Sequence, residues 1–319
     1  MLMLSADSAS ELFTSACRAV LAGGRPVAPR GVATLEILGA SLCLTNPRRR
    51  LVEAPPARVI NAAFAVAEAV WILSGSDDEW IYGYNGRLAE YADNGRLMGA
   101  YGPRLRRWQG AVDQLALVCR TLREDPGSRR AVVQLFDPGA DFRGHKDVPC
   151  TLGYRFFLRD GLLHMHTTMR SQDLWLGFCY DIFTATVIQE LVAGWLGAGL
   201  GAYRLQVDSL HLYTHDRARA ERLPAVAAPS PAGAPLAVPW DGFGELLSSV
   251  IANEPVRAGG WAEFAAVMAS YRAWKAGDRL TARLKAGGAD GPVAEALMRW
   301  YDRVGQAAGT QAGHDGEAR

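Results

Sequence analysis

The chain has 319 residues, of which 49% are hydrophobic and 21% charged, a composition typical of a soluble globular protein. Its formal net charge of +1 gives no electrostatic reason to expect nucleic acid or an acidic membrane as a partner. The sequence contains no uncharged run of 18 apolar residues, and its N-terminus lacks the basic start and apolar length of a signal peptide. We therefore expect a cytoplasmic protein that binds neither nucleic acid nor membranes.

The cysteine pattern argues against a structural metal. Five cysteines are scattered along the chain without any CxxC pair, so we expect reduced thiols and no metal site. Arginine accounts for 31 of the 34 basic residues, and alanine and glycine are abundant. This bias indicates a GC-rich genome, although arginine also suits bidentate binding of phosphate.

The first half of the chain mixes helical and strand patterns. Helices are predicted over 8–22, 57–74 and 109–124, the second apolar nearly all round and therefore buried. A strand with a kink at Gly39 is predicted over 32–44, and another strand over 130–136. The Gly-, Asn- and Tyr-rich stretch between 76 and 104 is typical of an irregular region that faces a ligand.

The second half begins with a hairpin signal. Alternating strands at 153–159 and 162–169 flank Asp160-Gly161, and a further strand is predicted at 203–212. A long buried helix is predicted over 182–198. Because helices and strands mix without regular βα alternation, we predict an α+β fold with a mixed sheet and surrounding helices.

We interpret residues 1–222 as a catalytic core and 223–239 as a Pro/Ala-rich connecting segment. A helical extension of the same domain follows at 240–307, and a disordered tail is expected at 308–319. Within the extension, helical patterns cover 240–252, 260–275, 277–285 and 291–307.

Three short segments carry the chemistry. Pro149-Cys150 precedes the run Arg170-Ser-Gln-Asp-Leu-Trp-Leu-Gly-Phe-Cys-Tyr-Asp181, and Asp208-Ser-Leu-His211-Leu-Tyr213 follows it. Together with Ser128-Arg129-Arg130, Glu68-Ala-Val-Trp71 and Tyr101-Gly102, these segments resemble the motifs of the thymidylate synthase superfamily, in the same order over residues 30–215. The resemblance implies a homodimer that binds a pyrimidine nucleoside monophosphate and uses 5,10-methylenetetrahydrofolate as co-substrate.

The departures from that family are informative. Asp181 stands where the synthases place the asparagine that reads uracil, and Thr151 replaces the usual histidine after the nucleophile. Leu88 stands in place of a tryptophan beside the folate, and the apolar closing tail is replaced by a different helical C-terminus. These features resemble the hydroxymethylase branch, whose substrates are cytidylates.

Cys150 is the candidate nucleophile. A thiolate that adds to C6 makes C5 of the pyrimidine an enamine-like carbon, and Arg170 is a suitable cation to lower the pKa of the thiol. The alternative is that Cys150 is a small buried hydrophobic residue.

Asp181 is the candidate reader of the base. A carboxylate accepts from N4 of cytosine and favours a protonated N3, whereas it repels O4 of uracil. The alternative is an N-cap of the helix that follows.

Glu68 lies in an apolar helix, where an unpaired carboxylate is costly. We expect general acid/base work through water, with an ion pair to an arginine as the alternative. Tyr101 is a candidate for removal of the C5 proton.

The resemblance also implies roles in binding. Arg170, Arg129 and Arg130 would bind the 5′-phosphate, the latter two across the dimer, joined by Ser171 and by either Arg30 or Arg25. His211 and Tyr213 would bind the sugar 3′-hydroxyl, and Asp173 would contact base and folate. Trp71, Leu88 and Gly177 would border the folate. The simpler alternatives are a solvated turn at Arg129-Arg130, a polar pair within a sheet at His211 and Tyr213, and a turn residue at Asp173.

We therefore predict a CMP 5-hydroxymethylase, with the ribose inferred only from a GC-rich genome that suggests nucleoside-antibiotic synthesis. The alternatives are a dCMP hydroxymethylase, a thymidylate synthase acting on dUMP, a folate-independent thiol hydrolase using Cys150 and His211, and a non-catalytic nucleotide-binding protein.

Overall fold

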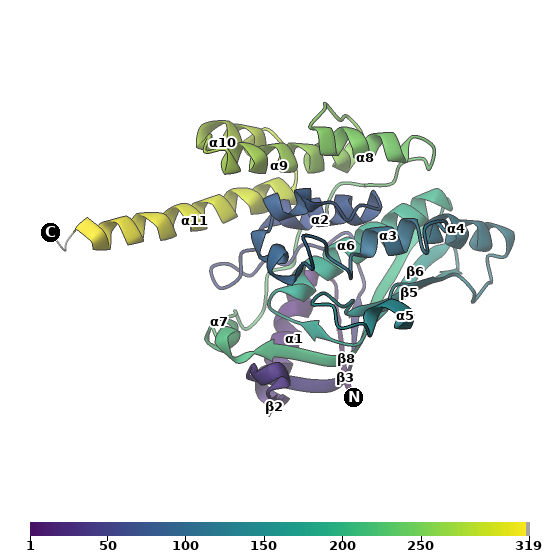
Figure 1. Ribbon diagram of the computed structural model, residues 1–319, viewed down its shortest axis with the longest axis horizontal. Coiled ribbons are helices and arrows are strands. Elements are labelled where there is room, and N and C mark those ends of the chain that lie inside the picture. The colour runs from purple at the N-terminus through teal and green to yellow at the C-terminus, as the bar shows by residue number, and fades with distance from the viewer. Residues whose placement is uncertain (317–319) are drawn as a thin grey trace.

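The computed structural model describes the backbone of residues 1–316 and the side chains of residues 1–306. Its centre is one mixed sheet with helices packed on one face, which confirms the predicted α+β class (Figure 1). Within residues 1–316, none of the helices is long and apolar enough to cross a bilayer.

Within the described residues, eight strands form the sheet, in the spatial order β1-β3-β8-β6-β5-β4, with β2 paired to β3 and β7 paired to β8. The pairs β1–β3 and β6–β8 are parallel, whereas β3–β8 and β5–β6 are antiparallel. The strands are β1 (Leu2–Ala6), β2 (Arg25–Val27), β3 (Thr34–Leu44), β4 (Val132–Gln134), β5 (Thr151–Arg159), β6 (Leu162–Met169), β7 (Gln172–Asp173) and β8 (Gly199–Tyr213).

The helices build outward from the sheet in layers. Helix α1 packs on β3 and β8, α6 packs on β6 and β8, α2 packs on α6, and α9 and α11 pack on α2 (Figure 1). The α-helices are α1 (Ala9–Gly23), α2 (Ala62–Leu73), α3 (Tyr101–Arg106), α4 (Gln114–Glu124), α5 (Pro138–Asp141), α6 (Gly177–Trp195), α7 (Arg217–Ala220), α8 (Phe243–Ala252), α9 (Gly259–Lys275), α10 (Arg279–Gly287) and α11 (Pro292–Gly316). Short 3₁₀ turns are η1 (Pro29–Gly31), η2 (Glu79–Gly83), η3 (Gly86–Tyr91) and η4 (Thr214–Asp216).

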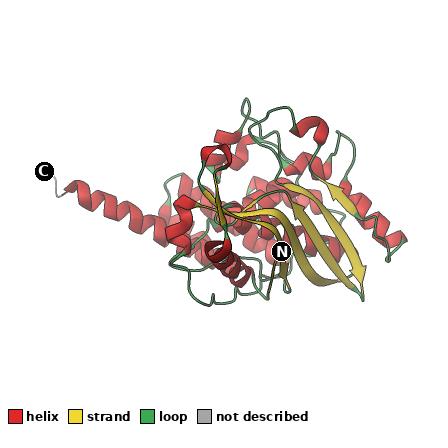
Figure 2. Ribbon diagram, turned by 90° about the horizontal axis from the view of Figure 1, so that it is seen from below, coloured by secondary structure: helices red, strands yellow, loops and turns green. Residues whose placement is uncertain are grey.

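The opposite face of the sheet is open. Seen from below, the broad part of the sheet faces the viewer without a helix over it (Figure 2). Half-buried side chains on this face include Phe157 and His166, whose rings lie 5.1 Å apart, and Arg155. A half-buried, partly aromatic sheet face is typical of a surface that packs against another protein surface.

Local sequence signals explain most elements. Ser8 caps α1 by accepting from the Glu11 backbone N–H, and its hydroxyl donates to the Glu11 carboxylate, which forms the predicted capping pair. The turn between β5 and β6 has positive φ at Asp160 and Gly161, as the Asp-Gly signal requires. Gly39 also has a positive φ, of 71°, inside β3, which confirms the kink predicted there.

The Pro/Ala-rich segment 223–239 is extended and bound to the core. Ser230 shares a 2.7 Å hydrogen bond with Ser10 of α1, and the Leu236 N–H donates to Glu190 of α6. The segment therefore crosses the surface to α8–α11, whose residues join the same hydrophobic core as α2.

The sequence predicts a disordered tail at residues 308–319. The backbone of α11 continues to Gly316, while residues 317–319 lie outside the described residues, as do the side chains from residue 307 onward.

Candidate active site

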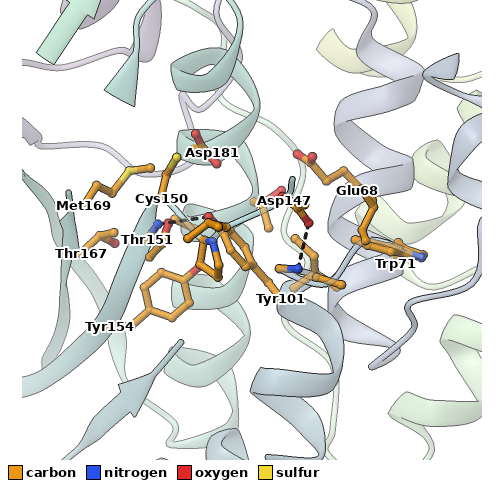
Figure 3. A pocket seen from close by; sticks show the side chains of 18 of the residues that line it. Glu68, Trp71, Tyr101, Asp147, Cys150, Thr151, Tyr154, Thr167, Met169 and Asp181 are labelled. Carbon is orange, nitrogen blue, oxygen red and sulfur yellow. Dashed lines mark hydrogen bonds between the residues drawn. The ribbon is translucent and has the colours of Figure 1, made fainter. Parts of the chain in front are cut away.

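One pocket gathers the four residues that the sequence suggests as catalytic: Glu68, Tyr101, Cys150 and Asp181 (Figure 3). It is a cavity of about 180 Å³ lined by α2, α3, α6 and the sheet strands β5, β6 and β8. Its wall also contains Trp71, Leu88, Leu97, Asp147, Thr151, Tyr154, Thr167, Met169 and Tyr203.

Cys150 is the residue just before β5, and Arg170 holds its segment in place. The Arg170 guanidinium donates from Nε to the Pro149 carbonyl and from Nη2 to the Val148 carbonyl, both at 2.9 Å. The Arg170 backbone N–H donates to the Cys150 carbonyl, also at 2.9 Å. These three bonds fix the backbone on both sides of the sulfur, while the Arg170 side chain stays exposed.

The pKa of the Cys150 thiol differs from our expectation. Burial raises it above the ordinary value and is the largest effect; Arg170 and Arg30 lower it, and the carboxylates Asp181 and Asp147 raise it further. Arg170 thus acts in the predicted direction, but burial outweighs it, and the net lowering of the Cys150 pKa that the sequence predicted is wrong.

Asp181 lies beside Cys150 on the first turns of α6 (Figure 3). Its Oδ2 accepts a 2.8 Å hydrogen bond from Nε2 of Gln172, and burial raises the pKa of Asp181 to about 6 despite this bond. The helix begins at Gly177 rather than at 182, so Asp181 lies inside it and the N-cap alternative is wrong.

The earlier helix start has a local cause. The Asp173 carboxylate accepts from the backbone N–H groups of Trp175 and Leu176, at 2.9 and 3.2 Å, and so forms the turn that leads into α6. The turn alternative for Asp173 is therefore present in the structure. Asp173 also lies next to His211 in the β7–β8 pairing.

Glu68 projects from α2 into the pocket, across from Asp181 (Figure 3). Burial, followed by repulsion from Asp181, raises the pKa of Glu68 to about 8. Glu190, the comparable acid of buried helix α6, is paired with Arg48 and Arg50. In the part of the chain whose side chains are described, no ion pair includes Glu68, so the structural ion-pair alternative is not found there.

Tyr101 is the first residue of α3, and its hydroxyl contacts Thr151, the residue that follows Cys150. The hydroxyl oxygen accepts a 3.1 Å hydrogen bond from the Thr151 backbone N–H. Burial raises the pKa of Tyr101 far above its ordinary value, so the phenol stays protonated. With its oxygen already accepting one bond, Tyr101 retains an O–H to donate within the pocket.

Trp71 and Leu88 form an apolar part of the wall. The Trp71 indole Nε1 donates to the Asp78 carbonyl at 3.0 Å, which fixes the ring, and Leu88 lies half-buried on η3. Gly177 does not line the cavity but packs behind Asp181: a Cβ on it would lie 2.8 Å from Gln172 Nε2.

A second group of predicted residues lies outside this cavity. His211 and Tyr213 project from β8 with their rings 5.2 Å apart, and Arg30 hydrogen-bonds the Tyr213 side chain. Arg30 also acts electrostatically on Cys150, which links this group to the pocket. Arg25 instead lies in β2, opposite Glu36 of β3, so the position of Arg30 suits a ligand near Cys150 better.

Arg129, Arg130 and Ser171 are not gathered at the pocket. Both arginines are exposed on the turn between α4 and β4, where the Arg130 backbone N–H donates to the buried Ser128 hydroxyl. The solvated turn that we gave as the simpler alternative for Arg129-Arg130 is therefore present in the structure. Ser171 is half-buried and does not line the cavity.

Two polar residues near the catalytic group were missed in the sequence. Gln172 was part of a recognised run, but nothing in its spacing indicates that it would contact Asp181, nine residues later. Asp147 lines the cavity and accepts a 3.0 Å bond from the Gly99 N–H. Its place three residues before Cys150 was the only signal available.

Comparison with known proteins identifies the family. Residues 11–229 match the family described as thymidylate synthase, which is more than half of the chain. The deoxyuridylate hydroxymethyltransferase of Bacillus phage SP01 is 35% identical over 230 residues, covering 68% of this chain and 60% of the relative.

Shorter matches extend the same relationship. The deoxyuridylate hydroxymethyltransferase of Pseudomonas phage M6 is 35% identical over 161 residues, covering 49% of this chain and 46% of the relative. A putative thymidylate synthase of Methanosarcina barkeri is 35% identical over 116 residues, covering 36% and 53% respectively. The matched region spans less than two thirds of each of these relatives. The family match and the similarity to the phage SP01 protein lead to one conclusion: this chain belongs to the thymidylate synthase family.

Proposed function

We propose that this protein transfers a one-carbon unit from 5,10-methylenetetrahydrofolate to C5 of CMP and hydrates it, giving 5-hydroxymethyl-CMP. The observation that carries the proposal is the position of Asp181, whose carboxylate lies in the same pocket as the Cys150 sulfur. The groups that shift the pKa of Asp181 include no cation. The choice of CMP over dCMP rests only on the composition, which indicates a GC-rich genome.

Asp181 would read the amidine edge of cytosine. One carboxylate oxygen accepts from Gln172, which leaves acceptor capacity for the N4 amino group. A pKa of about 6 lies close enough to neutrality for Asp181 to share a proton with N3 of the base. Uracil presents O4 and N3–H instead, so its O4 would face a carboxylate oxygen without a proton between them.

The same arrangement accounts for activation of Cys150. As the sulfur bonds to C6, its thiol proton passes to the shared position between Asp181 and N3, and the ring electrons displaced from the C5–C6 bond make C5 nucleophilic. Because Asp181 raises the pKa of Cys150, partial neutralisation of Asp181 by that proton also favours the thiolate. One proton moves from the Cys150 thiol to the position between Asp181 and N3, and no proton is required from solvent.

The apolar wall of Trp71 and Leu88 suits a flat heterocycle such as a pterin, and it borders Glu68. The folate would supply the one-carbon unit: C5 would bond to its methylene carbon, and loss of the C5 proton with release of tetrahydrofolate would leave an exocyclic methylene on C5. Glu68, protonated at neutral pH because its pKa is about 8, can donate a proton first and then, as a carboxylate, accept one from water. Because its phenol stays protonated, Tyr101 would assist loss of the C5 proton by donating a hydrogen bond to a water that accepts that proton.

Hydration completes the reaction. Water adds to the exocyclic methylene on C5, its proton passes to Glu68, and the Cys150 thiolate leaves C6 as the C5–C6 double bond re-forms. Leu88 is smaller than the tryptophan for which it stands, which leaves room for water next to Glu68.

Phosphate binding would be shared between subunits. Arg30 near Tyr213 and Cys150 suits the phosphate end of the nucleotide, with Arg170 beside it. Arg129 and Arg130 are exposed away from the pocket of their own chain, which suits donation to a partner's site. The open face of the sheet is a surface on which a second copy can pack (Figure 2).

The relatives' names favour a second candidate. Two of them are deoxyuridylate hydroxymethyltransferases, so a dUMP 5-hydroxymethylase on this site is the main alternative. It would keep Cys150 as the nucleophile and Glu68 as the acid and base, but the Cys150 proton would need an acceptor other than N3, which carries a hydrogen in uracil.

Mass spectrometry of the products distinguishes the candidates. Purified protein is incubated separately with CMP, dCMP and dUMP, each with 5,10-methylenetetrahydrofolate. We expect CMP to gain a hydroxymethyl group. A product from dUMP alone would establish the alternative, a methylated product would indicate synthase chemistry, and a hydroxymethylated dCMP alone would correct the sugar.

A further inference from the structure

We propose that Gln172 is a positioning residue that holds Asp181 in its ionised form and fixes which carboxylate oxygen meets the base. The inference rests on the proposed function, since it assigns the partner of the residue that reads cytosine. Gln172 lies on β7, five residues before α6 begins at Gly177. Its side chain does not line the cavity itself.

The hydrogen bonds determine the orientation of the Gln172 amide. Nε2 donates to Asp181 Oδ2 at 2.8 Å and lies 3.3 Å from the Asp173 carbonyl, so both neighbours on this side are acceptors. An amide turned the other way would place Oε1 against two oxygens. Gln172 therefore presents N–H groups to Asp181, and such a donor favours the charged carboxylate over the neutral acid.

The surroundings of Gln172 indicate that this bond, rather than general packing, dictates the residue. The side chain is 2% exposed, and among the described residues its Oε1 is buried without a hydrogen-bond partner. A buried unpaired carbonyl is unfavourable, so an apolar residue would suit the site better if filling space were its only task.

Gly177 leaves room for this contact. A Cβ at position 177 would lie 2.8 Å from Gln172 Nε2 and 3.2 Å from Asp181 Oδ2. The first residue of α6 therefore lacks a side chain at the point where the amide and the carboxylate meet. Gly177 was expected to border the folate; its contacts place it against this pair.

Several other ionisable groups surround Asp181, and none of them is a cation. They are Glu68 from α2, Tyr101 from α3, Cys150 from the residue before β5, Tyr154 from β5, Asp173 from β7, Cys179 from α6 and Tyr203 from β8. The Asp173 carboxylate favours a protonated Asp181, as burial does. Gln172 is the group that acts in the opposite direction.

In our proposal, the protonation state of Asp181 controls proton transfer from Cys150. The thiol proton of Cys150 can pass to the Asp181–N3 pair only if Asp181 is not already protonated. Removal of the Gln172 amide should therefore make the free enzyme lose activity at a higher pH than the wild type does.

The test is the pH profile of kcat/KM for the cytidylate substrate in wild type and in Gln172→Met, which keeps the volume of the side chain. The wild type should lose activity below about pH 6. In Gln172→Met this acid limb should move upward by about one pH unit, with about a fivefold loss near pH 6 and little loss near pH 8.

Gln189 offers a matched control. It is also buried, donates from Nε2 to the Leu163 and Gly201 carbonyls, and has an unpaired Oε1, but it contacts no carboxylate. Gln189→Met should lower thermal stability and leave the acid limb in place. Gln172→Asn, whose shorter amide falls short of Asp181, serves as a second variant if Gln172→Met does not fold.

A titration without substrate separates this inference from the proposed function. Carbon-13 NMR of aspartate-labelled protein, with the Asp181 signal assigned from Asp181→Asn, should show a higher pKa for Asp181 in Gln172→Met than in wild type. An unchanged Asp181 titration in a folded Gln172 variant overturns the inference, whatever the substrate. If the titration moves but the wild type does not act on cytidylates, the role of Gln172 stands and the proposed function fails.

Discussion

Glu68 and Glu190 illustrate how one residue type takes two roles in this protein. Both lie in helices whose other residues are largely buried. Glu190 is neutralised by Arg48 and Arg50, which makes it a structural group. Glu68 has instead a cavity, a neighbouring carboxylate and a pKa raised to about 8. An acid without a cation at the wall of a pocket is the arrangement that general acid/base chemistry requires.

The raised pKa of Glu68 predicts an alkaline limit to activity. In the free enzyme Glu68 is protonated below about pH 8, and this is the form that donates a proton in our proposal, so kcat/KM should fall above that pH. Glu68→Gln should lose this limb and reduce kcat by roughly 100-fold or more, because an amide cannot transfer the proton.

The exposed carboxylate of Glu90 on η3 provides the control. Steady-state rates between pH 5 and 10 should show the same alkaline limb in Glu90→Gln as in wild type. An alkaline limb that persists in Glu68→Gln would assign it to another group, such as the Cys150 thiol.

At the scale of elements, the start of α6 determines the geometry of the site. Asp173 forms the turn, Gly177 opens the helix, and Asp181 then faces the pocket. The sequence predicted this helix from residue 182 because the preceding Leu-Gly-Phe-Cys-Tyr run has no clear helical period. A carboxylate that bonds two successive N–H groups can be recognised only once the chain is folded.

The close contact at Gly177 yields a prediction about this element. In Gly177→Ala the added Cβ would displace the Gln172 amide from Asp181, so kcat/KM for the cytidylate should fall about tenfold and the Asp181 pKa should rise. Gly23→Ala, at the end of α1 with open space around its Cβ position, is the control and should keep full activity. Equal kinetics in the two variants would count against the role given to Gly177.

The elements that the sequence predicted best are those with long, regular patterns. The capped helix α1, the buried helix α2 and the β5–β6 hairpin were all expected near their observed positions. Strands β1 and β2 were missed because their sequences, Leu-Met-Leu-Ser-Ala and Arg-Pro-Val, do not alternate apolar and polar residues. Gln172 could not be identified as a partner of Asp181 for a related reason, because their contact depends on a turn rather than on spacing.

At the scale of the whole molecule, the C-terminal helices support the catalytic wall from behind. Helices α9 and α11 pack on α2, which carries Glu68 and Trp71. The Tyr84 hydroxyl donates to the Met268 carbonyl, and the Tyr271 hydroxyl donates to the Tyr84 carbonyl. These contacts connect the extension to the irregular region that contains Leu88, so the extension stabilises the pocket without lining it.

The exposed Arg129 and Arg130 predict that active sites are shared between two copies. Cys150→Ala alone should be inactive, and Arg129→Ala combined with Arg130→Ala should bind nucleotide poorly. After subunit exchange, an equal mixture of the two should regain roughly a quarter of wild-type activity, because each mixed dimer has one intact site. A mixture no more active than its parents would place these arginines outside the partner's site.

The most direct test of the account is competition between CMP and dUMP for the wild type and for Asp181→Asn, measured as the ratio of hydroxymethylated products at equal nucleotide concentrations. Asparagine keeps the size of the side chain but cannot share a proton with N3 or repel O4. We predict that the wild type favours CMP and that the variant loses CMP turnover by about 100-fold while gaining on dUMP. A wild type that favours dUMP, or a product ratio that is the same in both proteins, would contradict the claim that Asp181 selects the base.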